Sequence, residues 1–204
     1  MTLPRFYPVF DSADWVARSL VAGARLIQLR IKDHPEDLTR TEIARARDMA
    51  RRAGALLVIN DHWRIAIDLG CDWLHLGQED LDGADLAAIR RAGLKLGVST
   101  HDEAERDRAL SVAPDYVALG PVWPTILKKM PWAPQGLGRV TEWKRRTGNV
   151  PLVAIGGLSP ERGRAALAAG ADVVSAVTDI TLNADPDARM REWIVATAAN
   201  GGAP

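Results

Sequence analysis

Apolar residues occur in eight short runs along the chain, and a polar or amphipathic stretch follows each run. The runs are apolar at successive positions, which is typical of parallel strands covered on both faces. They cover residues 6–10, 25–30, 55–60, 72–77, 95–99, 115–120, 151–157 and 172–178.

Helical periodicity fills most of the intervals. Residues 12–23 begin at a candidate cap, Ser12, and end at Gly23. Residues 38–54 have apolar positions on one face and arginines on the other. The same scheme continues in WRIAIDLG, DLAAIRRAG, EAERDRALSVA, VTEWKRRTG and SPERGRAALAAG.

Eight such units in 204 residues predict a (β/α)8 TIM barrel. We expect one domain over residues 1–204, with 198–204 as a flexible tail. A doubly wound open sheet is the alternative, but neither GxGxxG nor GxxxxGK[ST] follows any run.

Composition narrows the classes of partner. Lysine and arginine balance aspartate and glutamate at 26 each, so no basic field indicates nucleic acid. No apolar run is long enough to span a membrane, and no signal-peptide core is present. Cys71 is the only cysteine. We expect a cytoplasmic protein that acts on small molecules, and the sequence leaves a homo-oligomer open.

In a barrel of this kind, chemistry gathers where the strands end. The second run ends with Gln28, Arg30 and Lys32 on one face. Arg30 and Lys32 could simply be solvated at the rim. Three polar groups facing the barrel would instead need a partner, and an arginine fork with a lysine charge suits a diphosphate.

Acidic groups follow the next two runs. Asn60 and Asp61 end the third, and Asp80 follows the fourth. Each could cap the next helix. Acidic loops after adjacent strands can also hold one hard cation, so Asp61 and Asp80 are candidate Mg²⁺ ligands. Ser99, after the fifth run, could contact a substrate or cap a helix.

A basic, proline-rich loop over residues 120–138 follows the sixth run. Its prolines oppose a regular helix and reduce the freedom lost on binding. Thr125, Lys128 and Lys129 are its candidate anion contacts. Gly156 and Gly157, after the seventh run, let backbone approach a phosphate closely. Two anion sites indicate an enzyme that joins a diphosphate to a monophosphate.

Seven segments, in order, resemble thiamine-phosphate synthases, a family that includes related thiazole tautomerases. They are QLRIK (28–32), ND (60–61), HLGQED (75–80), GVSTH (97–101), GPVWPT with a following lysine (120–128), AIGG (154–157) and VVSAV (173–177). The resemblance implies a (β/α)8 barrel transferase. It would join 4-amino-5-hydroxymethyl-2-methylpyrimidine diphosphate to a thiazole monophosphate and release pyrophosphate.

The resemblance also implies roles for individual residues. Contacts to the pyrimidine diphosphate would come from Gln28, Arg30, Lys32, Asn60, Ser99 and Lys128. The thiazole phosphate site would be lined by Thr125, Gly157, Val174 and Ser175. Asp61 and Asp80 would hold Mg²⁺. Arg30, Lys32 and Lys128 would stabilise the departing pyrophosphate in a dissociative, carbocation-like reaction.

One position departs from the family pattern. Leu127 stands where the family lid commonly has threonine. This difference could weaken or change the acceptor site. Two alternatives therefore stay open: a thiazole tautomerase, for which His101 would be the acid/base candidate, and a non-catalytic protein that binds thiazole or thiamine phosphate. The sequence assigns no partner to His75 or His101.

Overall fold

The computed structural model describes residues 2–125 and 132–198. Within them, parallel strands close into one barrel in sequence order, β1 to β8. The strands are β1 (Phe6–Phe10), β2 (Leu26–Leu29), β3 (Leu56–Asn60), β4 (Trp73–Leu76), β5 (Lys95–Thr100), β6 (Tyr116–Leu119), β7 (Leu152–Ile155) and β8 (Val173–Ala176). This confirms the predicted (β/α)8 barrel.

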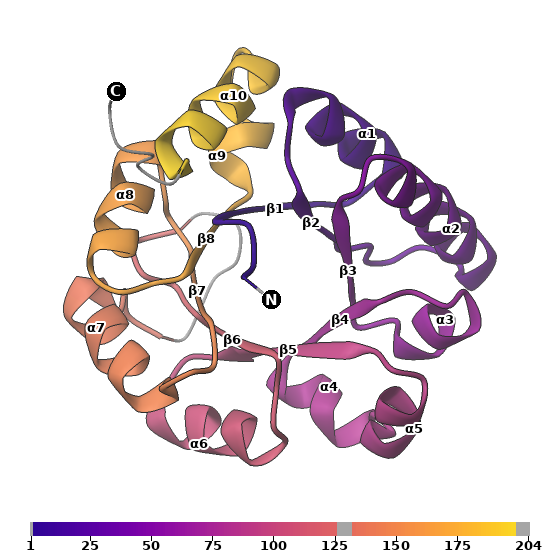
Figure 1. Ribbon diagram of the computed structural model, residues 1–204, viewed down its shortest axis with the longest axis horizontal. Coiled ribbons are helices and arrows are strands. Elements are labelled where there is room, and N and C mark those ends of the chain that lie inside the picture. The colour runs from indigo at the N-terminus through magenta and orange to yellow at the C-terminus, as the bar shows by residue number, and fades with distance from the viewer. Residues whose placement is uncertain (1, 126–131, 199–204) are drawn as a thin grey trace.

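Helices surround the barrel on its outer side (Figure 1). They are α1 (Ala13–Ala22), α2 (Glu36–Arg52), α3 (Trp63–Asp68), α4 (Gln78–Gly83), α5 (Leu86–Arg91), α6 (Glu103–Ser111), α7 (Gly136–Thr147), α8 (Pro160–Ala168), α9 (Thr178–Thr181) and α10 (Pro186–Thr197). No helix in the described part of the chain is long and apolar enough to cross a membrane.

Local chemistry sets several helix ends. The Ser12 hydroxyl accepts a hydrogen bond from the backbone N–H of Trp15, and Gly23 ends α1 with φ at 109°. A left-handed φ of this kind favours glycine because it has no Cβ. Ser159 caps α8 in the same way, with Pro160 in its first turn. The two serine caps therefore define where α1 and α8 begin, and Gly23 defines where α1 ends before β2.

The strands are buried on both faces, as their continuous apolar runs predicted. One apolar cluster lies between the barrel and its helices, where Phe6 stacks on Trp193 of α10 with ring centroids 5.4 Å apart. A second cluster fills the barrel interior and includes Leu3, Leu26 and Val153. The interior cluster closes the amino-terminal half of the barrel, so the carboxyl ends of the strands are left to form a site.

Two helices differ from the elements expected from the sequence. Residues 78–83, expected to be an acidic loop, form α4, and α10 was not foreseen. The tail expected over 198–204 lies, after Ala198, outside the described residues.

Candidate active site

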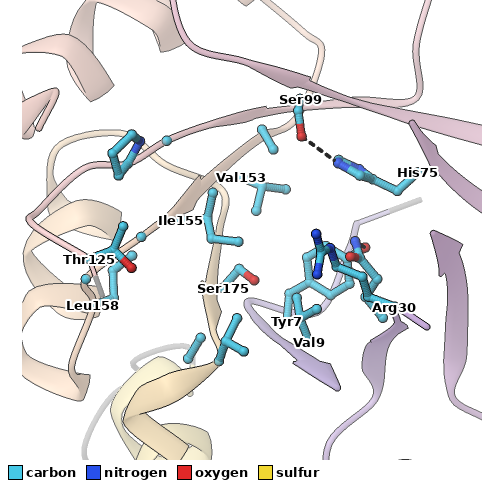
Figure 2. Close-up of a pocket in the computed structure, with 18 of the residues that line it drawn as sticks. Tyr7, Val9, Arg30, His75, Ser99, Thr125, Val153, Ile155, Leu158 and Ser175 are labelled. Carbon is cyan, nitrogen blue, oxygen red and sulfur yellow. Dashed lines mark hydrogen bonds between the residues drawn. The ribbon is translucent and has the colours of Figure 1, made fainter. Parts of the chain in front are cut away.

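A cavity of about 320 Å³ opens among the carboxyl ends of the strands (Figure 2). All eight strands, or the loops that follow them, contribute to its lining. The lining includes the predicted site residues Gln28, Arg30, Asn60, Ser99, Thr125, Gly156, Gly157 and Ser175. Predicted residues as far apart in the sequence as Gln28 and Ser175 thus share one cavity.

One edge of the cavity is built from β2, β3 and β4. Gln28 and Arg30 both line the cavity, as expected for alternate positions of one strand. Asn60 is buried at the end of β3 and also lines it. Arg30 lies close enough to His75 to influence its charge state. The Arg30 guanidinium therefore lies at the cavity beside the buried polar side chains of Gln28, Asn60 and His75.

Asp61 and Asp80 lie side by side just beyond the lining. The pKa of Asp80 is raised above its usual 3.8, first by burial and then by the neighbouring Asp61 carboxylate, with which it shares a hydrogen bond. Lys32 forms an ion pair with Asp61. Asp61 itself takes a left-handed φ of 62°, a conformation that costs free energy and that aspartate tolerates better than most residues.

Asp61 and Asp80 do not cap the helices expected from the sequence, although the Asp80 carboxylate accepts a hydrogen bond from the backbone N–H of Gly77 at the start of α4. His62 occupies the cap position of α3, and Asp85 caps α5 through its side chain. Asp102, not Ser99, caps α6. The capping alternatives for Asp61, Asp80 and Ser99 therefore do not account for their positions. Hereafter, the charged rim means Arg30, Lys32, Asp61 and Asp80.

The charged rim has the donor chemistry of a site for a hard divalent cation. Two adjacent carboxylates repel one another, and a cation between them relieves the repulsion. Among residues 2–125 and 132–198, no three His, Cys, Asp or Glu side chains gather in a complete metal cage. An ion held here would need oxygens from substrate or water, which is how Mg²⁺ commonly binds with phosphates.

The opposite wall is made mainly of backbone. Gly156 and Gly157 have φ values of 98° and 65°, and the loop after β6 packs directly on them. The backbone N–H of Val122 donates to Ile155 O at 2.9 Å, and that of Trp123 donates to Gly156 O at 3.0 Å. These bonds hold two loops against each other without charged side chains.

Ser175 and Thr125 complete this wall, and Figure 2 shows both near the cavity. The Ser175 hydroxyl is 1% exposed and has no hydrogen-bond partner among the described residues. A buried hydroxyl in this state is set up to bond a ligand oxygen. The glycine wall hereafter means Thr125, Gly156, Gly157 and Ser175.

Among the described residues, Lys32, Asp61, Asp80 and Val174 were predicted site residues but do not line the cavity. The Val174 side chain faces outward into the layer between barrel and helices, near Gly163 of α8. Lys128, with Leu127 and Lys129, lies outside the described residues. Just after that segment, Trp132 stacks on His101 with ring centroids 4.0 Å apart. The His101 Nδ1 lies 2.7 Å from Glu105 Oε2, which gives His101 a partner that its sequence context did not reveal.

A further set of polar residues was missed. Tyr7, Tyr116 and His75 lie in the barrel interior, in hydrogen-bond contact with one another. The available signal was that both tyrosines of the chain stand inside apolar strands. A buried phenol needs a hydrogen-bond partner.

The sequence matches the family described as "Thiamine monophosphate synthase" over residues 6–180. The chain belongs to the thiamine monophosphate synthase family. This agrees with the resemblance seen in the seven motifs and confirms that the chain is a member of an enzyme family.

Individual relatives give the same result. A thiamine-phosphate synthase of Rhizobium etli is 62% identical over 198 residues, 97% of each chain. One from Neisseria meningitidis serogroup B is 50% identical over 189 residues, 93% of this chain and 92% of its own. The solved thiamine phosphate pyrophosphorylase of Pyrococcus furiosus has a TM-score of 0.86, with 25% identity and 98% of each chain covered.

Proposed function

We propose that this chain is a thiamine-phosphate synthase that joins 4-amino-5-hydroxymethyl-2-methylpyrimidine diphosphate to a thiazole monophosphate. The observation that carries the proposal is that the charged rim reaches a cavity of about 320 Å³ through Arg30, while the glycine wall lines the same cavity. The charged rim suits a diphosphate with a bound cation, and the glycine wall suits a phosphate monoester.

The charged rim would hold Mg²⁺ through Asp61 and Asp80. The ion, when bound, would supply Lewis acidity that neutralises negative charge on the diphosphate. Arg30 and Lys32 would neutralise the remaining charge, together with Lys128 from the loop outside the described residues. Lys32 pairs with Asp61 in the structure, so we expect it to exchange that carboxylate for a diphosphate oxygen when substrate arrives.

The chemical step would begin with cleavage of the methylene carbon–oxygen bond. The electron pair leaves with pyrophosphate, and the electron-rich aminopyrimidine stabilises the positive charge left on the methylene carbon. The thiazole nitrogen then donates its lone pair to that carbon. In this scheme Gln28, Asn60 and Ser99 position the pyrimidine, the glycine wall anchors the thiazole phosphate, and the protein contributes positioning and electrostatics.

A tautomerase would need an acid/base histidine at the cavity, and His101 beside Glu105 meets that description. It would have no use for the paired carboxylates of the charged rim. The proximity of Asp61 and Asp80, with Asp80 partly buried, therefore favours the synthase. A binding protein that does not turn over substrate would likewise have no use for two paired carboxylates that hold a metal ion.

One assay tests the proposal. Purified protein is supplied with the pyrimidine diphosphate and thiazole phosphate, with Mg²⁺ or with chelator, while pyrophosphate and thiamine phosphate are followed together. We expect both products in equal amounts, and only with Mg²⁺. Folded protein that binds both ligands and forms neither product would contradict the synthase and favour the binding protein.

A further inference from the structure

Four hydrogen bonds connect five side chains across the barrel interior. Gln28 Nε2 donates to the Tyr7 hydroxyl, which lies 2.8 Å from the Tyr116 hydroxyl. The Tyr116 hydroxyl lies 2.8 Å from His75 Nδ1, and His75 Nε2 lies 2.8 Å from Ser99 Oγ. In this set, hereafter the tyrosine relay, every member except Tyr116 also lines the cavity, and Gln28 and Ser99 are its two ends.

The three side chains between Gln28 and Ser99 in the tyrosine relay are buried. Tyr7 is 2% exposed, Tyr116 1% and His75 7%. Gly97 of β5 makes room for the phenol, because a Cβ there would lie 1.9 Å from Tyr116 Cζ. Buried polar groups that lack water depend on their protein partners, so every proton in this set needs a defined acceptor.

The amide of Gln28 sets the direction at one end. Its Nε2 can only donate, so the Tyr7 oxygen accepts there. Within residues 2–125 and 132–198, the other hydrogen-bond partner of the Tyr7 hydroxyl is Tyr116, so its proton points to Tyr116. Tyr116 then has its own proton available for His75 Nδ1.

The direction continues through the imidazole. His75 Nδ1 lies 2.8 Å from the Tyr116 hydroxyl, which has its proton available, so Nδ1 accepts and is unprotonated. A neutral ring that accepts at Nδ1 holds its proton on Nε2 and donates it to Ser99 Oγ. The Ser99 proton is therefore free to point into the cavity. If every hydrogen bond ran the other way, the Tyr7 oxygen would accept from Tyr116, and the Tyr7 proton would have only the Gln28 N–H as a neighbour in the relay. A buried O–H without an acceptor is costly.

We propose that the tyrosine relay fixes Ser99 as a hydrogen-bond donor to the substrate. The Ser99 hydroxyl would donate to an unprotonated ring nitrogen of the pyrimidine, and this bond would select and orient the pyrimidine. Tyr7, Tyr116 and His75 act through Ser99 and are positioning residues, whereas Ser99 itself touches substrate. This inference rests on the proposed function for its substrate, but the proton order of the relay belongs to the free protein.

The proton order can be measured directly. The chain has four histidines, so the NMR spectrum of full-length protein with ¹⁵N-labelled histidine contains the signals of four imidazole rings. The His75 signals are those lost in His75→Gln. We expect His75 at neutral pH to show a protonated Nε2 and a bare Nδ1. A protonated Nδ1, or a ring protonated at both nitrogens, would overturn the proposal. This readout stands even if the protein proves not to be a synthase.

A double-mutant cycle tests the link to substrate. Tyr116→Phe removes the donor to His75, and we expect kcat/KM for the pyrimidine diphosphate to fall by about five- to tenfold, the usual worth of one hydrogen bond. Ser99→Ala should fall at least as far. If Tyr116 acts through Ser99, the double variant will be no worse than Ser99→Ala alone. If the loss of kcat/KM in the double variant equals the product of the two single losses, Tyr116 has a merely structural role and the proposal is overturned.

Thr197→Val is the matched control, because it also removes a buried hydroxyl but lies on α10, where Thr197 Oγ1 donates to Trp193 O at 2.8 Å. Combined with Ser99→Ala, it should add no loss of kcat/KM beyond the serine variant. If Tyr116→Phe does not fold, Tyr7→Phe interrupts the same relay one bond earlier. The His75 spectrum of either tyrosine variant should then show a mixture of ring tautomers.

Discussion

The two sides of the cavity offer an anion different kinds of contact. The charged rim uses side chains whose charges interact strongly, with Lys32 paired to Asp61 and Asp80 beside it. The glycine wall uses close backbone packing and a neutral hydroxyl. This difference fits two different tasks. In the proposed reaction a leaving diphosphate would gain negative charge, so fixed cations would stabilise its departure, whereas a phosphate that does not react would need only to be anchored.

The largest effect on activity is expected from Arg30→Ala. Loss of a charged, forked donor from the charged rim should lower kcat/KM for the pyrimidine diphosphate by on the order of 100-fold. Steady-state kinetics with each substrate varied in turn would measure it. Arg64→Ala, on the exposed face of α3, is a matched control. An equal loss in both arginine variants would remove Arg30 from its assigned role.

Asp80→Asn separates function from stability. We expect the Mg²⁺ concentration for half-maximal activity to rise by about tenfold or more, because one carboxylate ligand is lost. A carboxyl with a raised pKa destabilises the fold where it is charged, and this cost disappears as pH falls toward the ordinary value of 3.8.

Metal-free Asp80→Asn should therefore melt about 1–3 °C higher than the parent at pH 7, and the difference should vanish at acid pH. Thermal melts across that range, in chelator, would test the sign. A lower Tm at pH 7 would show that the Asp61–Asp80 pair stabilises the fold and is not a strained site awaiting a cation.

Gly157→Ala tests the glycine wall. A Cβ there would lie 2.3 Å from the Pro124 carbonyl oxygen, so the loop after β6 must move. We expect KM for thiazole phosphate to rise by about tenfold while KM for the pyrimidine diphosphate changes little. Gly54→Ala shares the left-handed φ, at 62°, but has nothing within 4 Å. It should lose about 1 kcal/mol of stability and no activity.

The smallest effect is expected from Ser175→Ala. Its hydroxyl has no partner among the described residues, so its removal should leave the Tm of the free protein unchanged or slightly raised. We expect a rise of about fivefold in KM for thiazole phosphate, equivalent to one lost hydrogen bond. A fall in Tm with unchanged KM would mean that this hydroxyl serves the fold instead.

The sequence predicted the barrel because each strand is a continuous apolar run and most helices end at a glycine. It also predicted Arg30 and Asn60 at the cavity, since strand-end position determines which side chains meet there. It did not predict α4, whose short segment Gln78–Gly83 is polar and acidic. The tyrosine relay was missed because Tyr7 and Tyr116 are 109 positions apart, and their contact depends on closure of the barrel.

The division of labour between the two sides can be tested most directly by binding alone. Calorimetry would compare Asp80→Asn and Ser175→Ala as binders of inorganic pyrophosphate with Mg²⁺ and, separately, of thiazole phosphate. We predict that Asp80→Asn loses Mg²⁺-dependent pyrophosphate affinity but retains thiazole phosphate, and that Ser175→Ala does the reverse. Parallel losses of both ligands in either variant would contradict the account of two separate anion sites.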